Sequence, residues 1–126
     1  MSFAVSDAVS QVLASALDGV SLRQRVIADN IANVDTPGFR ATSVDFETAL
    51  KSAISDGAFS NEHGESGIDH IDATTTPTDT PVGANGNNVD LRKETMAAVQ
   101  SQFQYQILTR AVNDRFNLVK IAGSAF

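Results

Sequence analysis

Cysteine is absent from the 126 residues of the chain. This absence excludes a disulfide framework, a thiolate zinc site and a cysteine nucleophile. Basic residues are scarce, with 9 Lys and Arg against 15 Asp and Glu, so the net charge is -6. Nucleic acids and anionic lipid surfaces both attract basic patches, so neither is expected as a direct partner.

Long apolar runs and common catalytic motifs are also missing. No run approaches the roughly 18 residues of a membrane span. Residues 1–16 contain no Lys or Arg, unlike the start of a secretory signal peptide. We therefore expect a cytoplasmic protein, unless a route that reads no such signal exports it. There is neither a Walker loop nor a Gly-x-Ser-x-Gly elbow, and we predict no enzyme.

Side chains that bind metals cluster once along the chain. The cluster comprises Glu62, His63, Glu65, Asp69, His70 and Asp72. His and carboxylate groups bind zinc and similar ions. However, His63 and His70 are separated by a Gly-containing segment that predicts no rigid frame. Solvated loop charge is the preferred interpretation, and we predict no metal, no cofactor and no catalytic residue.

The middle of the chain differs from both ends. No basic residue lies between Lys51 and Arg92, and that stretch is rich in Gly, Asn, Thr and Pro. Such a composition buries too little apolar surface to offset the entropy of ordering, so residues 57–88 are predicted to be a flexible acidic loop. A short helix is predicted before it, over about 44–55, with Gly57 after its end.

The first 34 residues predict one long helix. Val5, Val9 and Val12 extend an apolar side that falls within an arc of roughly 140°. The other apolar residues of this side recur at a 4-3 spacing. They are Leu13, Leu17, Val20, Ile27, Ile31 and Val34. The helix is expected to end at Thr36-Pro37-Gly38, because Pro37 disfavours helical dihedrals at Thr36 and Pro-Gly suits a type II turn.

A second long helix is predicted from about Leu91 to Ala122, with Asn88 or Asp90 as its cap and Gly123 closing it. Its apolar residues cover an arc of roughly 220°, against about 100° for a one-sided surface helix. They form two bands. One band holds Met96, Phe103, Ile107, Leu118 and Ile121, and the other holds Ala98, Tyr105, Leu108, Val112, Phe116 and Val119.

A helical hairpin can cover only one of these two bands. The short helix is only about 16 Å long, so we favour other chains over this helix as the cover for the second band. The predicted fold class is mainly all-α. Long N- and C-terminal helices (1–34 and 89–126) pack as an antiparallel coiled-coil pair. A Pro-Gly turn with a short helix (35–56) and the flexible loop (57–88) connect them within one domain.

One segment is more specific than these patterns. Residues 30–40 read Asn-Ile-Ala-Asn-Val-Asp-Thr-Pro-Gly-Phe-Arg, and Val-Asp-Phe follows at 44–46. This segment resembles the N-terminal signature of the flagellar axial proteins, the rod, hook and hook-associated family. The matching positions are Asn30, Asn33, Asp35, Thr36, Pro37, Gly38, Phe39, Asp45 and Phe46. The resemblance covers roughly residues 10–56 and 86–122 and is strongest to proximal-rod members.

The resemblance implies a structural subunit of the flagellar rod that assembles helically through its terminal helices and transmits motor torque. It implies as partners copies of the chain itself, other rod proteins, a FliE-type adaptor, the MS ring and the flagellar type III export apparatus. It implies a periplasmic rod location that is reached without a cleavable signal peptide. Another rod subunit of the same family is the nearest alternative, and a cytoplasmic helical adaptor or export chaperone is the alternative from a different class.

The residues expected at packing or assembly interfaces follow from the helix patterns. They are Leu13, Leu17, Val20, Ile27, Ile31, Val34, Met96, Phe103, Ile107, Leu108, Val112, Phe116, Leu118 and Val119.

Overall fold

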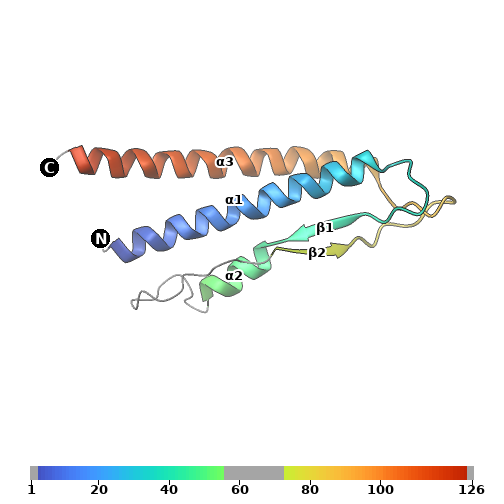
Figure 1. Ribbon diagram of the computed structural model, residues 1–126, viewed down its shortest axis with the longest axis horizontal. Coiled ribbons are helices and arrows are strands. Elements are labelled where there is room, and N and C mark those ends of the chain that lie inside the picture. Colours follow the sequence, from blue (N-terminus) through green and yellow to red (C-terminus); the bar gives the residue numbers. More distant parts are fainter. Residues whose placement is uncertain (1–2, 56–72, 125–126) are drawn as a thin grey trace.

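Long helices at both ends dominate the computed structural model, which describes residues 3–55 and 73–124. The elements are α1 (Phe3–Ala32), β1 (Thr42–Asp45), α2 (Glu47–Ser55), β2 (Thr74–Pro77) and α3 (Leu91–Ser124). Figure 1 shows α1 and α3 side by side and running in opposite directions, with the two ends of the chain at one end of the molecule. The prediction of a mainly helical chain with long terminal helices is confirmed.

A two-stranded antiparallel sheet accompanies the helices. Thr42 is opposite Pro77, and Asp45 is opposite Thr74. In the view of Figure 1, α3, α1 and then the sheet with α2 follow one another, and α1 contacts α3, β1 and α2. The first helix therefore lies at the centre of the fold, between α3 on one side and the sheet with α2 on the other.

The predicted helix over 44–55 starts too early. Val44 and Asp45 belong to β1, and α2 begins only at Glu47. The cause is local: the Asp45 carboxylate accepts hydrogen bonds from the Thr48 backbone N–H (3.2 Å) and hydroxyl (2.9 Å). Asp45 thus caps the helix N-terminus, and a cap residue has non-helical dihedrals.

Two further boundaries differ from the sequence prediction. Within the predicted loop 57–88, residues 74–77 form β2. All four are exposed, so no burial pattern marks the strand, and its partner lies far away in the sequence. Gly123 lies inside α3 instead of closing it. The cluster that contains His63 and His70 falls outside the described residues.

The apolar core lies between the middle of α1 and the segment that runs through β1 into α2. Ala16, Val20, Val44 and Phe46 form a buried cluster, and Leu108 of α3 packs against it. The Phe46 ring lies directly over Gly19, where an added Cβ would come within 3.0 Å of three ring atoms. Gly19 is therefore required for this close approach, although it weakens α1 locally.

Candidate functional site: a polar clasp and an exposed apolar stripe

At one end of the hairpin, residues 83–88 fold against residues 33–41, and we call these two segments the clasp. Asn87 is buried and holds both together. Its side-chain amide donates to the backbone carbonyls of Asn33 and Thr36, at 2.8 Å each. Its Oδ1 accepts from the N–H of Val89 at 2.7 Å. One side chain thus binds the turn after α1 to the start of the segment that enters α3.

Asn88 extends the clasp toward the sheet. Its Oδ1 accepts from the backbone N–H of Ala41 at 2.6 Å, and its own N–H donates to the Phe39 carbonyl at 3.2 Å. Its amide nitrogen lies 3.4 Å from both the Thr78 hydroxyl and the Thr80 carbonyl. Asn88 was predicted as a candidate cap of the last helix. In the structure Asp90 takes that position, because its carboxylate accepts from the Lys93 N–H at 3.2 Å.

Two glycines allow the two segments of the clasp to approach closely. Gly38 and Gly86 have φ angles of 75° and 80°, in the region that favours glycine. The Gly38 N–H donates to the Asn85 carbonyl at 2.9 Å, and a Cβ on Gly86 would lie 3.3 Å from the Gly38 Cα. The Phe39 N–H donates to the Thr36 carbonyl at 3.2 Å. Backbone meets backbone here, which leaves no room for a side chain at Gly86 without a shift.

Asn30 closes the outer edge of β1. It is 1% exposed, and its Oδ1 accepts from the Thr42 N–H (3.3 Å) while its Nδ2 donates to the Thr42 carbonyl (2.7 Å). The side-chain amide therefore replaces a neighbouring strand. Asn33, three residues later, bonds locally: its amide donates to the Asp29 carbonyl (2.8 Å), and its Oδ1 accepts from the Thr36 hydroxyl (3.1 Å).

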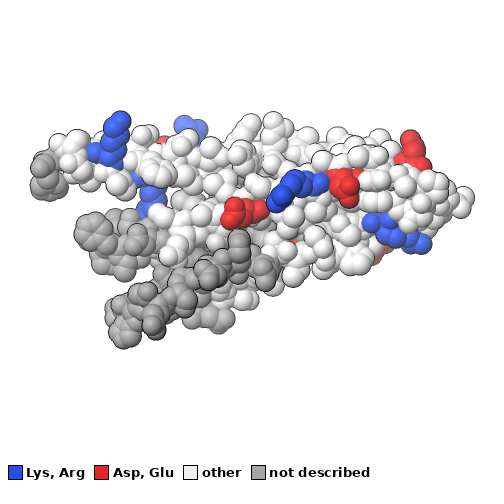
Figure 2. Space-filling view, viewed as in Figure 1, with Lys and Arg blue, Asp and Glu red and all other residues white. Residues whose placement is uncertain are grey.

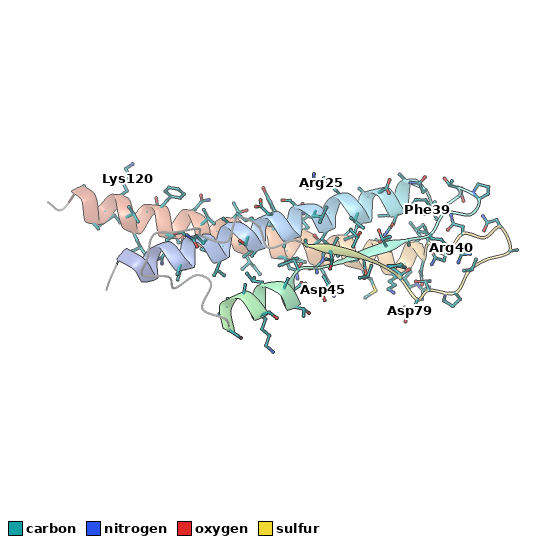
Figure 3. The ribbon with its side chains drawn as sticks, turned by 60° about the horizontal axis from the view of Figure 1, so that its bottom comes forward. Arg25, Phe39, Arg40, Asp45, Asp79 and Lys120 are labelled. Carbon is teal, nitrogen blue, oxygen red and sulfur yellow. The ribbon has the colours of Figure 1, made fainter. Side chains whose placement is uncertain are left out.

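The remaining motif residues lie around this centre. Asp35, Thr36, Pro37 and Gly38 form an exposed turn. In Figure 3, Phe39 and Arg40 lie at the clasp end, whereas Lys120 lies near the opposite end of α3. Asp45 caps α2, and hydrogen bonds from Thr48, chiefly from its backbone N–H, lower the pKa of the Asp45 carboxyl.

Arg23 joins α1 to several other elements. Its guanidinium binds both carboxylate oxygens of Glu47 at 2.6 Å and the Val44 carbonyl at 2.7 Å. It also donates to the Gln104 side chain of α3 at 3.1 Å and lies 4.8 Å from the centre of the Phe46 ring. The hydrogen bond from Arg23 lowers the pKa of Glu47.

The predicted apolar residues of α1 divide by position. Val20 and Ile27 are buried, whereas Leu13, Leu17, Ile31 and Val34 are half-buried. The two bands of α3 differ from each other. Met96, Phe103, Ile107, Leu118 and Ile121 are all between 60% and 68% exposed. In the other band, Leu108 and Val112 are half-buried and face α1, whereas Phe116 and Val119 are exposed.

We call the exposed apolar surface of α3 the α3 stripe. Its members are Met96, Val99, Phe103, Ile107, Leu118 and Ile121. Charged side chains are sparse on the face of the molecule in Figure 2, and neither sign dominates it. The α3 stripe is thus a continuous row of exposed apolar side chains on one helix. Monomeric proteins seldom expose large apolar surfaces of this kind.

A second apolar surface lies at the end of the hairpin away from the clasp, where α1 and α3 separate (Figure 1). A groove of about 330 Å³ opens between them. Its apolar lining consists of Leu13, Ala14, Leu17, Val112, Phe116 and Val119. We call this region the open end.

The described residues contain no group of three or more His, Asp or Glu side chains placed to hold a metal ion. Across the same residues, no helix combines the length and apolar character that crossing a membrane would require.

Comparison with known proteins places these features in one family. Residues 11–40 match the family described as "Flagella basal body rod protein". The chain is 36% identical over 118 residues to the flagellar basal body rod protein FlgB of Bacillus subtilis, covering 87% of this chain and 88% of the relative. Identity to the proteins of the same name is 33% in Borreliella burgdorferi, with 83% and 87% covered, and 32% in Escherichia coli, with 85% and 86% covered.

Proposed function

Because the chain belongs to the FlgB family of flagellar basal body rod proteins, and is thus a structural subunit of that rod, we propose that it assembles through the α3 stripe and the open end. Family membership places it in the flagellar basal body among other rod components. It also favours the rod subunit over the cytoplasmic adaptor or chaperone.

The exposure of the α3 stripe is the observation that supports this proposal. Five of its side chains are at least 60% exposed in the single chain. Each large apolar side chain that moves from water into a contact contributes about 1.5–3 kcal/mol. A rod in which subunits pack against one another provides such contacts. A contact between two different surfaces that does not close into a ring generates a helical filament.

The clasp has a different part in the proposal. We propose that it fixes α1 and α3 as an antiparallel coiled-coil pair and that Thr36-Pro37-Gly38 forms the type II turn at its base. The opposite directions of the helices, the 3.2 Å hydrogen bond across this turn and the positive φ of Gly38 support this. A fixed hairpin presents the α3 stripe in one orientation, which a shaft that transmits torque requires.

The partners proposed beyond the rod follow from the family resemblance. They are a FliE-type adaptor and the MS ring as neighbours, and the flagellar type III export apparatus as the route to a periplasmic rod. The distribution of apolar surface supports more than one neighbour, because the stripe and the residues of the open end lie on different faces of α3.

The test is incorporation of variants into purified basal bodies. Phe103→Ala removes a large side chain from the α3 stripe, and Phe116→Ala removes one from the open end; a buried Phe→Ala change costs about 3–5 kcal/mol. Both variants should be exported yet retained poorly in the rod. Asn113→Ala, an exposed polar position on the same helix, is the matched control. Wild-type retention of Phe103→Ala would show that the stripe is not an assembly surface.

A further inference from the structure

The α3 stripe carries two opposite charges near its middle. At about 100° per residue, Arg110 and Asp114 project into the same arc of roughly 100° as the apolar members of the stripe. Both side chains are exposed. The ion pairs Arg23–Glu47 and Lys93–Asp79 lie elsewhere, and among the described side chains neither Arg110 nor Asp114 forms an ion pair.

We propose that, outside the rod, the stripe of one chain is covered by the stripe of a second copy that runs antiparallel to it. This inference rests on the proposed function of the stripe as an assembly surface. The two charges are the reason for choosing this occupant. An antiparallel pair with its two-fold axis level with residue 112 places each Arg110 beside Asp114 of the other copy, so both pairs form at once.

The same register also matches the apolar members. Phe103 lies level with Ile121 of the second copy, and Ile107 lies beside Leu118 of that copy. The contact then extends over residues 103–121, about 27 Å of helix. An in-register parallel pair would instead place Arg110 beside Arg110 and Asp114 beside Asp114, which is unfavourable. The surface is therefore self-complementary in one orientation, as a closed two-fold dimer requires.

Such a dimer differs from the rod contact in its symmetry. A two-fold contact uses the same patch on both copies and closes on itself, whereas a growing rod needs a contact between two different patches. The antiparallel pair would therefore hide the α3 stripe without starting a filament. It would have to open before a subunit enters the rod.

Cross-linking tests the orientation, because the chain has no cysteine of its own. Two full-length variants, Ile107→Cys and Asn117→Cys, are purified with different tags, mixed and oxidised. The antiparallel register brings position 107 of one chain beside position 117 of the other. Each position lies about 15 Å along the helix from the same position in the second chain. A disulfide needs Cα atoms within about 7 Å. The mixed disulfide should thus dominate over both homodisulfides. Dominant homodisulfides would overturn the proposal. So would a yield of mixed disulfide no higher than that obtained when Asn113→Cys replaces Asn117→Cys in the mixture.

Charge exchange tests the register independently. Arg110→Glu should weaken the dimer about two- to thirtyfold, as expected for losing two exposed ion pairs. The exchanged variant, R110D with D114R, should return to within about twofold of wild type in sedimentation equilibrium, with helix content checked by circular dichroism. If the exchanged variant stays as weak as Arg110→Glu, the pairing is wrong. Poor rod retention of Phe103→Ala in a chain that shows no dimer would overturn this inference and leave the proposed function standing.

Discussion

The two ends of the hairpin, the clasp and the open end, differ in the interactions that their side chains make. At the clasp, the buried amide of Asn87 uses both donors and its acceptor within the same chain, and beside the clasp Asn30 pairs with both backbone groups of Thr42. At the open end, α1 and α3 separate around an apolar groove, and Phe116 is 72% exposed. The clasp has its hydrogen-bond partners in the same chain, whereas the part of the chain that the structure describes leaves Phe116 at the open end largely exposed.

The hydrogen bonds of the clasp and the apolar surface of the open end therefore have different roles. Directional hydrogen bonds specify how α1, the sheet and α3 meet, because each buried amide left unpaired is costly. Apolar surface has no such geometric requirement and can be matched by a neighbouring subunit. The structure therefore separates the part of the chain that sets its own conformation from the part that joins the assembly.

The largest effect is expected from Phe46→Ala, which removes the ring between the sheet and α1. Phe46 is buried against Gly19. Its loss should lower the free energy of unfolding by about 3–5 kcal/mol. Urea unfolding followed by circular dichroism measures this. Ile54→Ala, on exposed α2 surface, is the control and should change stability little. Equal effects of the two substitutions would contradict the location of the core.

An intermediate effect is expected from substitutions in the clasp. Asn87→Ala leaves the Val89 N–H without its acceptor and removes one of the two donors to each of the Asn33 and Thr36 carbonyls, which keep only the Thr36 and Phe39 N–H groups. Each buried group left unsatisfied costs about 1–3 kcal/mol. Asn87→Asp should be at least as harmful, since an ionised carboxylate cannot donate to the two carbonyls. Faster amide exchange at Ala41 and Asn88 would report the opening. If either variant leaves this exchange unchanged, the clasp does not hold the hairpin.

The smallest effect concerns the Arg23–Glu47 pair. Binding to Arg23 lowers the folded-state pKa of Glu47 below its ordinary value of 4.5. The pair therefore stabilises the fold above pH 4.5, and this stabilisation is lost as the pH falls through the lower folded pKa. Because Glu47 is half exposed, the contribution is about 0.2–1 kcal/mol. Glu47→Gln should remove this part of the acid dependence. Denaturation midpoints between pH 3 and 7 that vary identically in both proteins would refute it.

The sequence predicted the helical parts of the fold from periodic patterns. The terminal helices, the apolar arc of α1 and the two bands of α3 all follow from spacing over many residues. The short strands were missed because β2 is four exposed residues whose pairing partner lies on a distant segment. The start of α2 was also misplaced. Asp45 caps this helix, so Val44 before it lies in β1, and the helical spacing of apolar residues does not indicate where the cap lies.

The candidate site was predictable in the same uneven way. The family motif marked Asn30, Asn33 and Gly38, but only as members of a signature. The buried amides that hold the clasp bond far along the chain: Asn87 bonds to Thr36 across 51 residues, and Asn88 bonds to Ala41 across 47. No local pattern indicates such pairings. The same holds for Arg23, whose contacts with Glu47 and Gln104 depend on how three elements meet.

The most direct test of the account follows a single thiol on the α3 stripe. Leu118→Cys provides the only cysteine of the chain. In the dilute isolated protein it should react readily with a maleimide, as its 64% exposure indicates. In purified basal bodies it should be protected until they are denatured, because a neighbouring subunit covers it. Labelling of native basal bodies as fast as of denatured ones would contradict the claim that assembly buries the stripe.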